Sequence, residues 1–167
     1  MEHAKKRGAK IYAELAGAGM AGSTDGLLRY DMNGDSMTQA MSLAVEEPST
    51  IDYISAAANS TLDLDQAETL AIQKVFKGRA KEISISSLKS MLGEFDGSGG
   101  IRACAAALAL YHGVIPPTIG TEHVSPQCDL NIVLHLPQKR AMRSALLNSS
   151  SNGGSSISLW FKDFQSA

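Results

Sequence analysis

Apolar and polar positions along this chain follow two different spacings, which alternate from segment to segment. In some segments apolar residues recur every three or four positions, and in others every second position or in short unbroken runs. The first spacing is typical of a helix with one buried face, and the second is typical of strands. The helices predicted in this way span residues 2–8, 36–45, 63–78 and 101–110. The predicted strands span residues 11–15, 51–54, 83–85, 129–136, 141–148 and 157–161.

The order of these elements predicts the fold class. Helix and strand alternate three times, one more helix follows, and strands end the chain. Alternation of this kind is typical of α/β layering, with helices packed against a mostly parallel sheet. The serine and glycine run at residues 149–156 lies between two apolar segments, so we expect it to be a turn that joins two strands. The sheet should therefore end in an antiparallel pair.

The centre of the fold is predicted at residues 83–111. A strand is followed by a polar turn over residues 89–100 and then by the helix at 101–110, which is apolar on nearly every face apart from Arg102. A helix that is hydrophobic all round lies inside a domain or a membrane. This helix is shorter than the ~20 residues that a bilayer requires. We therefore expect a buried central helix.

Glycine and aspartate mark the turns in the first third of the chain. The backbone is expected to be loose after the first strand because three glycines follow it: Gly17, Gly19 and Gly22. Residues 23–34 are read as a loop. The segment 31–35 has the aspartate and asparagine spacing of a calcium loop, but its glycine is misplaced and no glutamate closes it. We expect a turn and a helix cap there, with Asp63 or Asp65 capping the next helix.

Composition and charge narrow the class of protein. With 167 residues the chain is expected to be one domain, spanning residues 1–167, or one half of a larger one. A net charge of −2, the lack of a basic stripe and 5% aromatic residues give no sign of binding to nucleic acid or a membrane surface. The first ten residues lack the apolar core of a secretory signal, and the two cysteines form no metal pattern. We expect a cytoplasmic protein without cofactor or metal.

Most of the remaining reactive residue types have an ordinary structural interpretation. Cys104 and Cys128 are expected to be inert thiols of the core. No histidine has a partner at ligand or triad spacing, and all four are expected either at the surface or with their hydrogen bonds satisfied: His3, His112, His123 and His135. Ser60 and Thr61 are expected to form turn and cap hydrogen bonds. Lys89 and Glu94 lie five residues apart in the central turn, and we expect them to pair as a salt bridge.

Several segments, in order, resemble one known family. They are EHAKKRGAKIYAEL, IDYISAAANSTLDLDQAETLAIQKVF, ISSLKSMLGEFDGSGG, GVIPPTI, CDLNIV and LNSSSNGGSSISLWF. Together they are similar to the C-terminal half of a β-ketoacyl-acyl-carrier-protein synthase, of the thiolase-like superfamily, over almost the full length. The resemblance implies a thiolase-like half, in which a layered sheet carries helices on both faces and a buried central helix.

The resemblance also implies a reaction and the residues that perform it. In this family an acyl group sits on a cysteine, malonyl on a carrier protein loses carbon dioxide, and the resulting carbanion attacks the thioester. Two histidines support these steps as positioned donors, and a lysine organises the site. By position, the histidines correspond to Ala57 and Glu94, the lysine to Lys89, and the phenylalanine that gates the acyl pocket to Asn152. The nucleophilic cysteine belongs to the N-terminal half.

The replaced histidines favour a degenerate subunit that resembles a chain length factor. Such a subunit would pair with another ketosynthase chain and reach acyl carrier protein through the complex. The alternatives are the C-terminal part of a split enzyme that is completed by a separate N-terminal half, and a folded remnant of a decayed gene. A lone half would expose the apolar face that normally meets the other half. We therefore expect a hetero- or homo-oligomer rather than a stable monomer.

Overall fold

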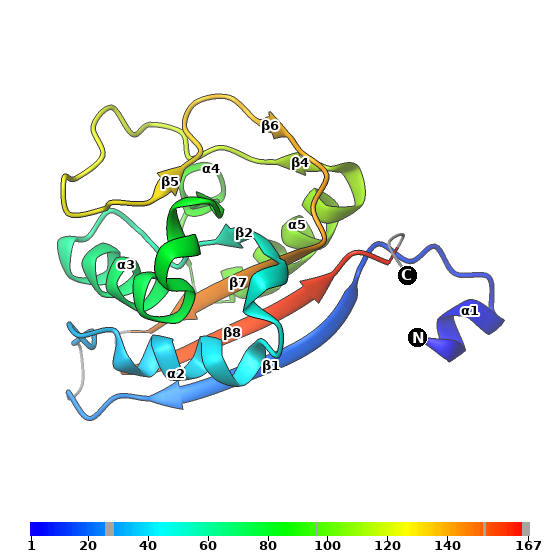
Figure 1. Cartoon of the computed structure of the whole chain (residues 1–167), viewed down its shortest axis with the longest axis horizontal. Coiled ribbons are helices and arrows are strands. Elements are labelled where there is room, and N and C mark those ends of the chain that lie inside the picture. The colour runs from blue at the N-terminus through cyan, green and yellow to red at the C-terminus, as the bar shows by residue number, and fades with distance from the viewer. Residues whose placement is uncertain (26–28, 96, 152, 165–167) are drawn as a thin grey trace.

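The computed structural model describes residues 1–25, 29–95, 97–151 and 153–164. Its main sheet has six strands: β1 (Glu14–Gly22), β2 (Ile51–Ser55), β3 (Ser84–Ser86), β5 (Asn131–Ile132), β7 (Ser144–Ser150) and β8 (Ser155–Lys162). Their spatial order is β1-β8-β7-β2-β3-β5 (Figure 1). The β7–β2, β2–β3 and β3–β5 pairs are parallel, whereas β1–β8 and β7–β8 are antiparallel. The predicted α/β class, with a parallel centre and an antiparallel ending, is confirmed.

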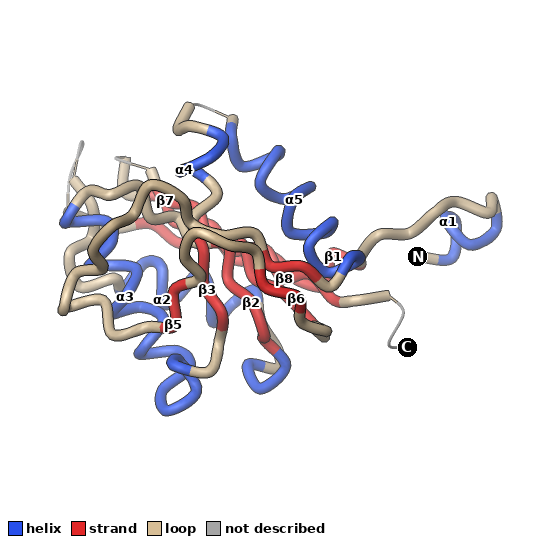
Figure 2. The backbone as a smooth tube through the Cα atoms, turned by 90° about the horizontal axis from the view of Figure 1, so that it is seen from above, coloured by secondary structure: helices blue, strands red, loops and turns tan. Residues whose placement is uncertain are grey.

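Helices cover both faces of this sheet. α2 (Asp35–Ala44) and α3 (Leu62–Phe76) lie on one face, and α5 (Ser98–His112) lies on the other, as Figure 2 shows from above. The shorter elements are α1 (Glu2–Lys6), α4 (Lys89–Leu92), the 3-10 turns Pro48–Thr50 and Lys77–Lys81, and the small β4 (Val114–Ile115) and β6 (Gln138–Lys139) pair. Within the described ranges, no helix has the length and apolar content needed to cross a bilayer.

The two faces hold separate hydrophobic cores, and β7 contributes to both. Leu146 packs with α2 and α3, while its neighbours Ala145 and Leu147 pack with α5. Successive side chains of a strand point to opposite faces, so this arrangement follows from the pleat. β2 contributes in the same manner, with Ile54 on the α2–α3 side and Tyr53 on the α5 side. The central strands are therefore buried on both faces, as parallel strands usually are.

The first strand differs from its prediction. It spans Glu14–Gly22, not residues 11–15, and the glycines expected to loosen the backbone lie inside it. Gly17 and Gly19 allow close packing, because a Cβ atom on Gly19 would lie 2.8 Å from the Cβ atom of Leu43, and one on Gly17 would collide with the carbonyl oxygen of Ala44. Glycine lets α2 pack directly onto the backbone of β1. Sequence patterning missed this because glycine has no side chain to count.

The central helix also differs in burial. α5 is longer than expected and buries one face only, with Arg102, Ala106 and Leu110 turned to the sheet. On the opposite face Ile101 is 50% exposed and Leu108 is 43% exposed. The all-round apolar pattern predicted a buried helix, but the described chain covers only the face that is turned to the sheet. The expected complete burial is therefore wrong for this chain.

Other predictions are confirmed with shifted boundaries. The helices expected at residues 2–8, 36–45 and 63–78 correspond to α1, α2 and α3, and Thr61 rather than an aspartate lies at the N-cap of α3. The strand expected over 129–136 is reduced to β5. Part of the predicted loop at 23–34 lies outside the described residues. Asp31 accepts hydrogen bonds from the backbone N–H groups of Asn33 and Ser36, which confirms the turn and cap.

Candidate functional site

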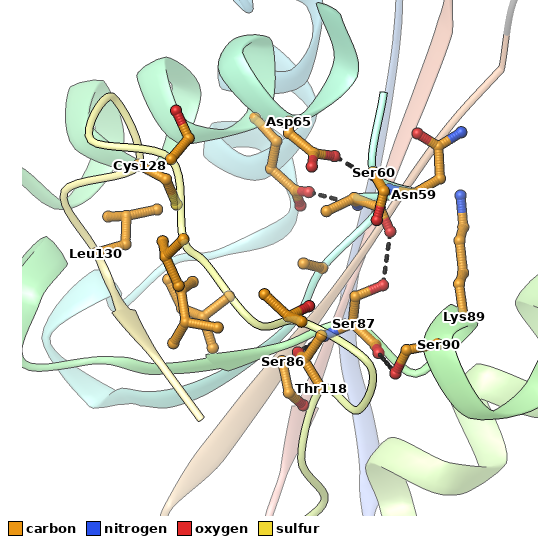
Figure 3. Close-up of a pocket in the computed structure, with 18 of the residues that line it drawn as sticks. Asn59, Ser60, Asp65, Ser86, Ser87, Lys89, Ser90, Thr118, Cys128 and Leu130 are labelled. Carbon is orange, nitrogen blue, oxygen red and sulfur yellow. Dashed lines mark hydrogen bonds between the residues drawn. The ribbon is translucent and has the colours of Figure 1, made fainter. Parts of the chain in front are cut away.

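A pocket of about 590 Å³ lies where β2 and β3 end. Its walls come from the turn after β2, from α3, from the segment between β3 and α5, and from the loop that precedes β5 (Figure 3). Ligands of open α/β sheets bind beyond the carboxyl ends of parallel strands. Asn59, Lys89 and Ser90 lie together at one end of the pocket, called the polar end here, and Cys128 and Leu130 lie at the other end (Figure 3).

The turn after β2 is fixed by a buried glutamate. Glu68 of α3 accepts hydrogen bonds from the backbone N–H groups of Ala57 (2.9 Å) and Ala58 (2.8 Å) and from the side-chain amide of Asn148 (3.0 Å). Burial raises the pKa of the Glu68 carboxyl, and these donors together with Arg102 act in the opposite direction. Every donor here favours the ionised carboxylate. The turn is therefore anchored through its backbone.

A second buried charge ties the ends of two strands. Arg102 of α5 is 1% exposed, and its Nη2 donates to the carbonyl oxygens of Ser55 (3.3 Å), Ala56 (2.6 Å) and Asn148 (2.6 Å). Burial lowers the pKa of Arg102, and the negative charge of Glu68 opposes that effect. The guanidinium thus links the end of β2 to the C-terminal part of β7 through buried carbonyl groups.

Lys89 and Glu94 meet at the polar end of the pocket. The Lys89 Nζ atom lies 2.5 Å from Glu94 Oε1, and the Asn59 side-chain amide donates to Glu94 Oε2 at 2.8 Å. The Lys89 side chain is 7% exposed, and that of Glu94 is 47% exposed. Burial tends to raise the pKa of Glu94, but the hydrogen bonds from Lys89 and Asn59 outweigh it and leave the pKa below its ordinary value. The expected salt bridge is confirmed.

The structure brings two of the predicted site residues together and keeps one apart. Ala57 is fully buried, and its backbone N–H binds Glu68. Lys89 and Glu94 form a salt bridge at the polar end of the pocket. Asn152 lies outside the described residues. Ser60 has a left-handed backbone in the turn, and the Thr61 hydroxyl donates to Asn59 Oδ1, so the expected turn role is confirmed. The expected cap hydrogen bond is wrong, because Thr61 lies at the N-cap of α3 but makes no side-chain cap hydrogen bond.

Both cysteines differ from the prediction of core thiols. Cys104 is exposed, because it lies on the outer face of α5. Cys128 is half-buried in the wall of the pocket, and burial raises the pKa of its thiol. All four histidines are exposed, as expected.

Sequence reasoning missed Glu68 and Arg102 as parts of the site. Glu68 is charged and lies in a helix, which usually means a solvated face, and only its position beside the apolar stripe at Ala67 and Ala71 signalled burial. Arg102 was visible as the single charged residue of an apolar helix. A charge in such a helix needs a partner.

Comparison with known proteins identifies the family. A sequence model described as "Beta-ketoacyl synthase, C-terminal domain" matches residues 12–122. The chain belongs to this family. The chain is 36% identical to 3-oxoacyl-acyl-carrier-protein synthase 2 of Synechocystis sp., over 99% of its own length and 41% of that protein. This β-ketoacyl synthase domain thus spans about two-fifths of the curated relatives that it matches.

Solved ketosynthases share its fold. The chain superposes with a TM-score of 0.93 and 32% identity on a structure described as a type II PKS acyl-carrier protein in complex with its ketosynthase bound to the hexaketide, over 97% of this chain and 41% of that one. It superposes with a TM-score of 0.91 and 30% identity on the ishigamide ketosynthase/chain length factor, over 98% and 41%. The predicted thiolase-like half is therefore confirmed as the fold of this ketosynthase domain.

Proposed function

We propose that this domain belongs to a ketosynthase-like subunit of fatty acid or polyketide synthesis that does not itself catalyse condensation. In this proposal it pairs with another ketosynthase chain and meets acyl carrier protein through that complex. The observation that carries the proposal is the state of Glu94, which occupies the position of the second family histidine. Its carboxylate accepts hydrogen bonds from Lys89 and Asn59.

The chemistry of both replaced positions supports this proposal. An ionised carboxylate accepts hydrogen bonds and cannot donate them to a developing oxyanion. Its charge would also repel the carbanion formed from malonyl. Ala57, at the first histidine position, has no side-chain donor at all. Loss of one oxyanion donor costs ~10²–10³ in rate, so loss of two should leave little turnover.

An exposed apolar surface supports the proposed pairing. Ile101 and Leu108 lie on the outer face of α5, and Met20 of β1 and Ile157 of β8 are cross-strand neighbours, 70% and 39% exposed. The neighbouring Gly19 packs on α2, so the strand pleat turns Met20 toward the α5 side of the sheet. In this proposal the exposed apolar side chains on the α5 side of the sheet form the interface with the partner. The partner would be a ketosynthase N-terminal half or a full ketosynthase chain.

A second candidate is the C-terminal part of a split β-ketoacyl synthase that is active once completed. Two observations favour it: Lys89 is present, and the turn at Ala57 and Ala58 keeps its anchor on Glu68. In that case the condensation of acyl and malonyl groups would use donors supplied by the other polypeptide. The non-catalytic proposal requires a partner chain that is a ketosynthase in its own right, whereas the split enzyme requires only an N-terminal half.

Purification of the natural gene product under native conditions, followed by intact mass measurement of its companions, tests both candidates. The proposal expects a second ketosynthase chain that carries its own nucleophilic cysteine. A bare N-terminal half as the companion would support the split enzyme. The purified chain alone should release no carbon dioxide from malonyl-acyl-carrier protein and form no β-ketoacyl product.

A matched variant separates the chemistry of this chain from that of its partner. In the purified complex, Glu94→Gln should leave the condensation rate within about twofold of the wild type, because Glu94 takes no part in the reaction. A large fall in kcat for Glu94→Gln, or condensation by the chain with a bare N-terminal half, would overturn the non-catalytic proposal. The cytoplasmic location and the single domain over residues 1–167 stay predictions.

A further inference from the structure

The polar end of the pocket contains a nearly buried cation, Lys89, that forms a salt bridge with the carboxylate of Glu94. The Lys89 side chain is 7% exposed, and its Nζ atom contacts Glu94 Oε1. Asn59 lies in the turn after β2, and its side-chain amide donates to Glu94 Oε2. Figure 3 shows Lys89 extending from α4 toward the turn that carries Asn59. Two donors from different elements thus converge on one carboxylate.

We propose that Lys89 and Asn59 form a binding site for a small carboxylate and that Glu94 of this chain fills the site as an internal ligand. The inference stands apart from the proposed function, because it concerns binding and not condensation. Charge-assisted hydrogen bonds to a carboxylate are roughly twice as strong as neutral ones. A second donor that is fixed in place adds orientation.

The position of Glu94 makes it a replaceable ligand. It follows Gly93, which has a left-handed backbone and ends α4, and its side chain is 47% exposed. Lys89, in contrast, is enclosed by the pocket wall. Removal of the Glu94 carboxylate would take away the group that the nearly buried Lys89 ammonium contacts, and breaking a buried pair in this way is costly. The space vacated would open into the pocket of about 590 Å³.

Two other carboxylates face the same pocket, and their charges do not exclude the site. Asp65 accepts a hydrogen bond from the Asn59 backbone N–H, and Glu68 is satisfied by the turn at Ala57 and Ala58. Both already coexist with the carboxylate of Glu94. A small carboxylate at the same place would meet the same electrostatic field.

Chemical rescue with acetate tests the inference on the full chain in the assembly in which it purifies. Acetate reproduces the end of the glutamate side chain that Glu94→Ala removes. In that variant, 100 mM acetate should raise the unfolding midpoint above its value in sodium chloride of equal ionic strength. A dissociation constant of about 10 mM corresponds to a rise of about 3–5 °C. The wild type should not respond, because Glu94 competes as a tethered ligand.

Lys89→Met combined with Glu94→Ala is the matched control, since it removes both charges and keeps the length of the side chain. The double variant should show no acetate-specific rise, and saturation-transfer NMR should detect bound acetate in the single variant only. Equal rises in wild type and Glu94→Ala, or no acetate binding to Glu94→Ala, would overturn the inference. Neither result would bear on condensation, so the proposed function is tested separately.

Discussion

Replacement of Gly19 by alanine tests how α2 packs on the sheet. A Cβ atom at this position would lie 2.8 Å from the Leu43 Cβ atom, and closer still to the carbonyl oxygen of Ala40. Ordinary contact between carbon atoms begins near 3.5 Å, so α2 must move outward by about 0.7 Å or more. Overpacking costs ~1–3 kcal/mol, and the atoms on both sides are main-chain or Cβ atoms that cannot rotate away. We expect a loss near the upper end, about 3 kcal/mol.

Gly22→Ala is the matched control for that experiment, because it lies in the same strand and an added Cβ atom would meet nothing within 4 Å. Both substitutions reduce the flexibility of the unfolded chain equally, so that effect cancels in the comparison. Urea titration of the full chain should show the Gly19→Ala midpoint lower by about 1 M or more, with an unchanged slope. Coincident midpoints for the two variants would refute the close packing of α2 on β1.

Three further predictions address the site and the exposed face. Glu68→Gln replaces one of the two oxygens that accept from the backbone N–H groups of Ala57 and Ala58 with an amide donor, and should cost about 3 kcal/mol in urea titrations. The exposed control Glu122→Gln should change stability by less than about 0.5 kcal/mol. Because folding lowers the pKa of Glu94, the ionised Glu94 carboxylate stabilises the folded state at pH values above the ordinary pKa of 4.5. The difference in unfolding midpoint between wild type and Glu94→Gln should therefore shrink as pH falls below that value. A maleimide, followed by intact mass, should label exposed Cys104 quickly in the isolated chain and slowly in a complex that covers α5, and half-buried Cys128 slowly in both.

The periodicity of apolar residues predicted the parts of the fold that depend on side chains. Met37, Ala40 and Met41 recur at helical spacing and do form the buried face of α2. The same rule failed at β1, where Gly17 and Gly19 contribute contacts through their backbone. The pattern of apolar side chains cannot reveal positions where close packing requires that there be no side chain.

The candidate site was predicted in part, for a similar reason. The spacing of Lys89 and Glu94 within one short turn predicted their salt bridge, because neighbours in sequence meet without knowledge of the fold. Asn59 joins them only because β2 and β3 pair in parallel, which places the turn after β2 beside α4. Glu68 and Arg102 act on groups 10 or more residues away, and those partners depend on the packing of α3 and α5 against the sheet.

The framework of the site does not depend on the residue types that carry the family's reaction. At residue 57 the group that binds Glu68 is the backbone N–H, which every residue but proline provides. Arg102 likewise binds carbonyl oxygens, which no substitution at residues 55 and 56 removes. The turn can therefore keep its shape with alanine at position 57. A preserved fold and pocket are therefore compatible with the proposed non-catalytic role, in which residues 57 and 94 supply no donor to the reaction.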